Sequence, residues 1–244
     1  MKKMKSMNRI TLLITSGAIA LALCICLGGA YMVKAVATRS ADKENAEESY
    51  KKIYSELVEE LSTSGQADMF ALVNVDDDDI PELAAVSSEG SWDKEQVFLY
   101  TTDGKEAVLL ADDIAPGMEG HYIAFFEKEN VFIQSGGAMG ERFIFSRIED
   151  SKPVEITSAE RFWLPDENDD EVVSCMVGDK EVSEKEFKET VEKNMPAKEM
   201  IKLAEVDTPD MVKYEVSFED DYMGLNEIEK IPYSTYDEIV EMLK

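Results

Sequence analysis

Four consecutive aspartates stand between two short apolar segments in the stretch FALVNVDDDDIPELAAV, residues 70–86. In twelve-residue calcium loops, side-chain oxygens at positions 1, 3, 5 and 9 and the backbone carbonyl at position 7 bind the ion. Numbering from Asn74 places an oxygen-bearing side chain at each of those positions and an isoleucine at position 7. The predicted ligands, with water completing the shell, are Asn74, Asp76, Asp78, Ile80 and Glu82.

Three residues depart from the usual EF-hand pattern. Asn74 replaces a charged ligand, Asp79 occupies the place of the glycine that permits a sharp bend, and Ala85 cannot provide a bidentate carboxylate at position 12. The EF-hand-like loop is therefore expected to bind Ca²⁺ weakly, with a Kd on the order of 10⁻⁴ to 10⁻³ M. The alternative is an acidic turn without metal, because adjacent carboxylates turn easily and are well solvated.

Other candidates for chemistry are weaker. Residues 135–140 (SGGAMG) are glycine-rich but lack the Gly-Lys-Ser/Thr ending of a phosphate loop, so they predict a connection between two strands. His121 is the only histidine, and a nucleophile pair would have to combine it with Cys175 or a serine. With 52 acidic residues, a pair of carboxylates for glycoside hydrolysis can always be proposed, so no particular pair is indicated.

The N-terminal segment indicates export. Lys2, Lys3, Lys5 and Arg9 precede an uncharged, mostly apolar run of 24 residues at 10–33, long enough to cross a bilayer of roughly 30 Å. Residues 1–37 are therefore expected to be a signal peptide, cleaved after the Ala35-Val36-Ala37 site, or an uncleaved membrane anchor; lipoprotein processing at Cys24 or Cys26 is a third alternative. Residues 38–244 are the expected extracytoplasmic domain, with a possible subdivision near residue 152.

The charge of the chain limits its partners. The formal net charge is −27 at pH 7, and no acidic residue precedes Asp42, so the exported part carries all the acids. Such a field repels nucleic acid phosphates and anionic lipids, which excludes nucleic acid as a partner. Contact with a membrane is expected only through an uncleaved N-terminal segment. Cys175 is the only cysteine after the apolar run, so no disulfide within the exported part supports the fold.

The elements that position the acidic loop can be predicted from periodicity. Apolar residues at spacings of three and four over 50–61 predict an amphipathic helix before the loop. Short β-type segments follow, and Asp103-Gly104 predicts a tight hairpin between two of them. Ser183 with Glu186, and Thr235 with Glu238, form the capping boxes of two C-terminal helices. The predicted fold class is α+β, mainly an antiparallel meander of seven or more strands.

The acidic stretch resembles a known signature. FALVNVDDDDIPELAAV is similar to the YALxDIDGDGIPELxV motif of a poorly characterised family of exported proteins from Gram-positive bacteria. The match covers about seventeen residues, with looser similarity over 50–148 and around GDKEVSEKEF. The resemblance implies an N-terminal helix, an aspartate loop and a series of strands, and it lends ligand roles to Asn74, Asp76, Asp78 and Glu82. It implies no activity.

These observations favour one function and leave one alternative. The favoured function is a non-enzymatic cell-surface or secreted domain with a structural calcium loop that binds a protein or a cell-wall ligand. The alternative is a hydrolase of extracellular polymers that uses an unidentified Asp/Glu pair. A cleft lined by carboxylates and aromatic residues would favour the hydrolase.

Overall fold

The computed structural model describes residues 46–87, 96–114, 121–137, 140–165, 171–204, 210–219 and 222–244. The predicted signal peptide or membrane anchor, residues 1–37, lies outside these residues. Residues 48–244 form one compact unit. None of the helices in the described part of the chain has the length and apolar character needed to cross a bilayer.

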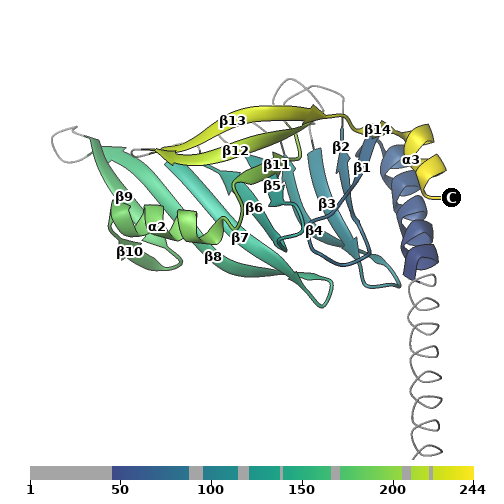
Figure 1. Ribbon diagram of the computed structural model, residues 1–244, viewed down its shortest axis with the longest axis horizontal. Helices are drawn as coiled ribbons and strands as arrows, with labels where there is room; N and C mark the ends of the chain where they lie inside the picture. Colours follow the sequence, from purple (N-terminus) through teal and green to yellow (C-terminus); the bar gives the residue numbers. More distant parts are fainter. Residues whose placement is uncertain are drawn as a thin grey trace, which may run out of the picture. The chain divides into compact units, whose positions relative to one another are not determined.

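The α+β prediction is confirmed, with the antiparallel strands divided between two sheets (Figure 1). The small sheet has the strand order β14-β1-β2-β3-β4. Its strands are β1 (Met69–Val73), β2 (Glu82–Val86), β3 (Gln96–Thr102), β4 (Ala107–Ile114) and β14 (Ser234–Thr235). The predicted Asp103-Gly104 hairpin joins β3 to β4, and the φ of +82° at Gly104 explains the glycine.

The large sheet has the strand order β10-β9-β8-β7-β6-β5-β11-β12-β13. Its strands are β5 (Tyr122–Phe126), β6 (Val131–Gly136), β7 (Gly140–Glu149), β8 (Lys152–Pro165), β9 (Glu171–Val177), β10 (Lys180–Val182), β11 (Glu199–Lys202), β12 (Met211–Glu219) and β13 (Tyr222–Ile231). Lys152, the predicted point of subdivision, lies next to the turn of the β7–β8 hairpin.

Three helices cover the sheets. Within the described residues the N-terminal helix covers 46–64, and α2 (Glu184–Asn194) and α3 (Tyr236–Met242) lie in the C-terminal part. Both predicted capping boxes are present: Glu186 accepts from the backbone N–H of Ser183, and Glu238 accepts from that of Thr235. Figure 1 shows the N-terminal helix and α3 beside the small sheet, and α2 on the concave side of the curved large sheet.

The core is built in three apolar layers. One lies between the small sheet and the two outer helices and includes Tyr54, Val58 and Phe70. A second lies between the two sheets, and a third lies between the large sheet and α2. The small sheet is thus covered on both faces, which explains why every residue of β2 is buried.

Candidate functional site

The acidic loop connects β1 to β2 and is attached to two other elements. Tyr54 of the N-terminal helix donates its hydroxyl to the carbonyl of Pro81 at 2.9 Å. From the turn between β5 and β6, the N–H of Lys128 donates to the carbonyl of Asn74 at 3.0 Å, and that of Asn130 donates to the carbonyl of Val75 at 2.8 Å. The loop therefore joins the N-terminal helix, the small sheet and the large sheet.

The turn that holds the loop is itself fixed to the large sheet. Lys128 and Asn130 have positive φ angles of 62° and 52°. The Asn130 amide oxygen accepts from the N–H of Ile148 at 2.8 Å, and its Nδ2 donates to the carbonyl of Ile148 at 3.1 Å. Asparagine suits this position because it tolerates a left-handed backbone and its side chain can pair with a neighbouring strand. The acidic loop thus rests on a well-supported turn.

Asp76 and Asp78 fold back onto the backbone of the loop. Oδ1 of Asp76 accepts from the N–H of Asp78 at 3.1 Å, and Oδ1 of Asp78 accepts from the N–H of Ile80 at 2.6 Å. Asp77 and Asp79 are exposed. Asp78 is exposed as well, whereas Asp76 is partly buried. Asp76 and Asp78 each shape the loop through one of these bonds.

Glu82 lies beneath the loop, with only 1% of its surface exposed. Its Oε2 accepts from the N–H of Val75 at 2.8 Å, and its Oε1 accepts from the hydroxyl of Thr101 at 3.4 Å. Burial, reinforced by the negative charges of Asp76 and Asp78, raises the pKa of the Glu82 carboxyl to about 8, although the Val75 N–H opposes this shift. The carboxyl therefore keeps its proton at neutral pH.

The carboxyl of Asp78 is also affected by its burial and by neighbouring negative charges. Burial raises the pKa of its carboxyl and Asp76 adds to the effect, while the hydrogen bond from the Ile80 N–H opposes it. In both carboxyls of the loop, burial and neighbouring negative charges thus disfavour the charged form. A bound cation would reverse this penalty, because an adjacent positive charge favours the ionised carboxylate.

The five predicted metal ligands are only partly brought together. Asp76, Asp78 and Glu82 act on one another electrostatically, whereas the side chain of Asn74 is exposed. Within the described residues, no group of three or more His, Cys, Asp or Glu side chains is arranged to hold a metal ion. The other two predicted ligands, the Asn74 amide oxygen and the Ile80 backbone carbonyl oxygen, do not belong to these side-chain types. The chemistry of the donor set therefore fits Ca²⁺, while the carboxylates do not form a convergent cage.

Tyr54→Phe is expected to reduce the free energy of unfolding by about 1 kcal/mol, because it removes one buried hydrogen bond to the Pro81 carbonyl. The ring itself is fully buried and stays in place. Urea denaturation of both proteins measures the difference. An unchanged midpoint would show that this bond does not hold the loop to the helix.

Cys175 and His121 do not form a nucleophile pair. Cys175 is buried in the core layer under α2, and burial raises the pKa of its thiol. His121 lies in a separate polar cleft, where its Nδ1 is 3.4 Å from Oδ1 of Asp113, and Cys175 does not line that cleft. Cys175 is therefore a structural residue.

The glycine-rich segment connects β6 to β7, as predicted. A Cβ atom at Gly136 would lie 2.8–3.0 Å from three ring atoms of His121, and one at Gly140 would lie 2.0 Å from the carbonyl oxygen of Arg161. The glycines at these two positions permit close packing of neighbouring groups. Nothing in this arrangement resembles a phosphate-binding loop before a helix.

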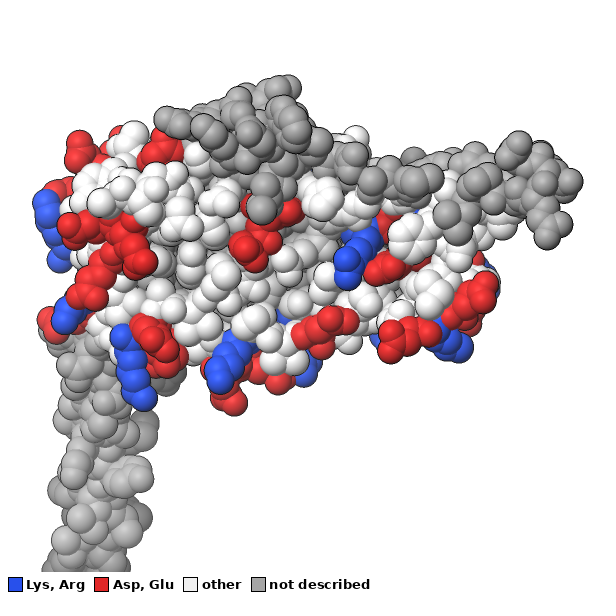
Figure 2. Space-filling view, turned by 180° about the vertical axis from the view of Figure 1, so that it is seen from behind, with Lys and Arg blue, Asp and Glu red and all other residues white. Residues whose placement is uncertain are grey.

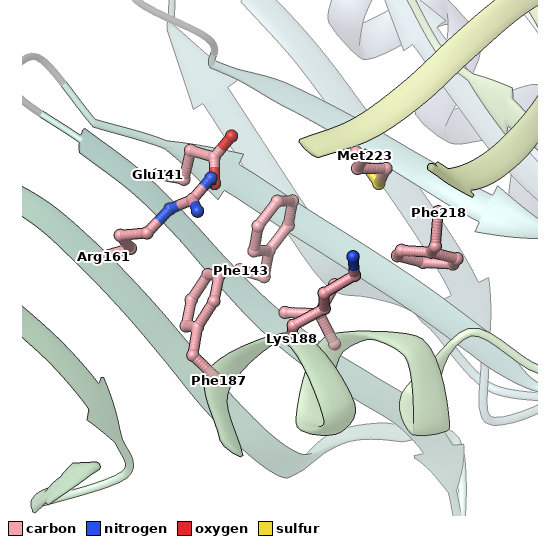
Figure 3. Close-up of a pocket in the computed structure, with 8 residues that line it drawn as sticks. Glu141, Phe143, Arg161, Phe187, Lys188, Phe218 and Met223 are labelled. Carbon is pink, nitrogen blue, oxygen red and sulfur yellow. Dashed lines mark hydrogen bonds and ion pairs between the residues drawn. The ribbon is translucent and has the colours of Figure 1, made fainter. Parts of the chain in front are cut away.

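A small apolar pocket lies between α2, β7 and the β12–β13 hairpin (Figure 3). On one side of it, Arg161 forms an ion pair with Glu141 at 2.7 Å and lies over the rings of Trp163 and Phe187. The pocket has a volume of only about 20 Å³. This is little more than the space of one water molecule, so it is a gap in the packing of α2.

The sequence pattern singles out Asp76, Asp78 and Glu82 but contains no sign of the groups that contact them. Tyr54 belongs to the apolar pattern of the predicted helix, which gives no sign of its hydrogen bond to Pro81. Thr101 and Asn130 carry no local signal, because their roles depend on contacts between segments distant in the sequence. Comparisons of the chain with family models, curated proteins and solved structures found no match.

Proposed function

We propose that this chain is a non-enzymatic exported domain, anchored in the membrane or released, whose acidic loop binds Ca²⁺ for a structural purpose. The observation that carries the proposal is Glu82, a carboxyl beneath the loop whose burial, reinforced by the charges of Asp76 and Asp78, raises its pKa to about 8. Ca²⁺ would displace the proton of Glu82 and offset the burial and the negative charges that disfavour the ionised carboxylate.

The position of the loop explains what Ca²⁺ would do there. The loop is bonded to the N-terminal helix through Pro81 and to the β5–β6 turn through Asn74 and Val75. An ion held by Asn74, Asp76, Asp78, Ile80 and Glu82 would therefore stabilise the junction of three elements. Binding that is confined to the folded state stabilises it in proportion to the logarithm of the ion concentration.

A ligand-binding role for the rest of the domain is part of the proposal. Figure 2 shows acidic side chains spread over the described surface of one face, with fewer basic ones among them. This charge disfavours nucleic acid and anionic lipid. The partner we propose is a protein or a cell-wall ligand.

Calorimetric titration of the full-length chain with CaCl₂ tests the calcium site. We expect a Kd on the order of 10⁻⁴ to 10⁻³ M for the wild type and no measurable binding for Asp76→Asn/Asp78→Asn. Asparagine keeps the Oδ1 acceptors that fold the loop, so this variant removes charge without removing the turn bonds.

Asp77→Asn/Asp79→Asn is the matched control, because it removes the same charge from two exposed positions. It should bind Ca²⁺ more tightly than Asp76→Asn/Asp78→Asn, since it keeps all five proposed ligands. Equal loss in both double variants would mean that the loop attracts Ca²⁺ only as a diffuse cluster of charge, against the proposed site. Mg²⁺ should bind more weakly, because it demands near-ideal octahedral geometry.

The second candidate function is a hydrolase of extracellular polymers. The observation that favours it is the polar cleft beside His121, which is lined by Asp112, Asp113, Glu160 and Phe162. Release of reducing ends from polysaccharides, compared between wild type and Asp113→Asn/Glu160→Gln, tests this candidate. Absence of hydrolysis by the wild type would remove it.

A further inference from the structure

A polar cleft of about 390 Å³ lies where β4 of the small sheet meets β6, β7 and β8 of the large sheet. Its volume falls within the range of small-molecule sites, roughly 300–1,000 Å³. None of the residues of the acidic loop lines it. The cleft is therefore a second site with its own chemistry.

Hydrogen-bonding groups in the cleft wall occur as neighbouring donors and acceptors. Nε of Arg142 donates to Glu160 at 2.9 Å, and Nδ1 of His121 is 3.4 Å from Asp113. Nε2 of Gln134 donates to the carbonyl of Asp112 at 3.3 Å. Each pair comes from different strands or segments, so the sheet packing sets their positions.

These groups retain hydrogen-bonding capacity toward solvent. The side chains of Arg142 and His121 are 52% and 41% exposed. A guanidinium has five N–H donors and a carboxylate has two acceptor oxygens, so one contact between Arg142 and Glu160 leaves further atoms of both for a ligand. Ile144 and Phe162 add apolar surface to the same cleft.

We propose that this cleft binds a neutral saccharide. A sugar hydroxyl both donates and accepts, which suits a wall where guanidinium, imidazole and amide groups stand beside carboxylates. The apolar face of a sugar ring suits Ile144 and Phe162. This inference rests on the proposed function as a binding domain and names the class of its ligand.

The charges of the cleft argue against ionic ligands. Among the described residues that line the cleft, Asp112, Asp113 and Glu160 are carboxylates and Arg142 and His121 are the basic groups, so an anion meets net repulsion. A cation would have to compete with Arg142 for Glu160 and with His121 for Asp113. A neutral polyhydroxy ligand avoids both costs.

Gly136 contributes to the shape of the cleft. A Cβ atom there would lie 2.8 Å from Cε1 of His121, so any other residue would push the imidazole away from β6. The glycine lets the His121 ring lie against the strand beside Asp113. Gly136 of the glycine-rich segment thus helps to shape the wall of the cleft.

Titration of the full-length chain with three neutral tetrasaccharides, maltotetraose, cellotetraose and tetra-N-acetylchitotetraose, tests the proposal. The chain is kept in a detergent without a sugar head group. His121 is the only histidine of the sequence, so its imidazole NMR signals report occupancy of the cleft. We expect saturable shifts of these signals with at least one tetrasaccharide, and none with tetragalacturonate or spermidine.

Two matched variants locate the binding. Arg142→Met should weaken the affinity about tenfold by removing charge-assisted hydrogen bonds. Arg147→Met should leave the affinity unchanged, since Arg147 is also on β7, is 48% exposed and pairs with Glu149 outside the cleft.

The proposal is overturned by any of three results: no shift of the His121 signals with the three sugars, equal affinities of the two variants, or preferential binding of the anionic or cationic probe. Calcium titration of the same sample reports the proposed function separately. Loss of sugar binding with intact calcium binding would therefore refute only the saccharide assignment.

Discussion

Glu82→Gln is expected to raise the free energy of unfolding at pH 9 by about 3–5 kcal/mol in calcium-free buffer, and to leave it nearly unchanged at pH 4. The Glu82 carboxyl has a pKa of about 8 in the folded chain, against an ordinary value of 4.5. Stability from the neutral carboxyl is therefore fully present below pH 4.5 and is lost as the pH rises to 8. Glutamine is neutral at every pH and keeps an acceptor for the Val75 N–H.

Urea denaturation of wild type and variant from pH 4 to 9, in the presence of EDTA, measures this difference. Glu238→Gln is a control of opposite sign, because hydrogen bonds from Thr235 hold the pKa of that exposed carboxyl below its usual range. Its contribution to stability is present above the ordinary pKa and is lost as the pH falls through the folded value. A difference between wild type and Glu82→Gln that does not change with pH would contradict the electrostatic account of the loop.

Gly140→Ala is expected to lower the free energy of unfolding by about 3 kcal/mol through overpacking. An added Cβ would lie 2.0 Å from the carbonyl oxygen of Arg161 and 3.0 Å from Cα of Phe162. Both are backbone atoms, so neither can rotate away, and the pairing of Gly140 with Phe162 must open. The resulting strain acts on the backbone at Arg161, whose side chain is buried against α2.

Gly224→Ala is the comparison for this effect. A Cβ at Gly224 would lie 2.6 Å from Oγ of Ser217, a side-chain atom that can move to another rotamer. Its cost should be below about 1 kcal/mol. Thermal or urea unfolding of both variants measures the two losses, and losses of equal size would show that the backbone contact at Gly140 does not control the β7–β8 pairing.

Local elements of this fold could be predicted because their signals are local. The apolar spacing of Tyr54, Val58 and Leu61 marked the N-terminal helix, and all three residues are buried as expected. Ser183 with Glu186 marked the start of α2. These signals lie within one or two turns of helix, so the rest of the fold does not alter them.

The division of the strands into two sheets could not be predicted. β14 pairs with β1, and β11 pairs with β5, across long stretches of sequence. Turn residues specify hairpins between neighbouring strands but contain no information on such distant pairings. The sequence also gives no clear strand signal for β11, which is very short, or for β13, which is rich in charged residues.

The candidate site, like the fold, could be predicted from the sequence only in part. The alternation of Asp76 and Asp78 was visible in the sequence, and the loop bonds follow it. The burial of Glu82 was not visible, because β2 is covered on both faces and shows no alternating pattern. The polar cleft depends on the packing of β4 near the large sheet, so His121 and Arg142 gave no shared signal.

Thermal unfolding of the full-length chain with and without 5 mM CaCl₂ tests the central claim, a structural calcium site in the acidic loop, most directly. At about ten times the expected Kd, Ca²⁺ should add about 1.4 kcal/mol and raise the Tm by about 3 °C in wild type. Asp77→Asn/Asp79→Asn should show the same rise, and Asp76→Asn/Asp78→Asn should show none. A wild-type Tm that is unchanged by Ca²⁺, or a rise that is equal in both double variants, would contradict the account.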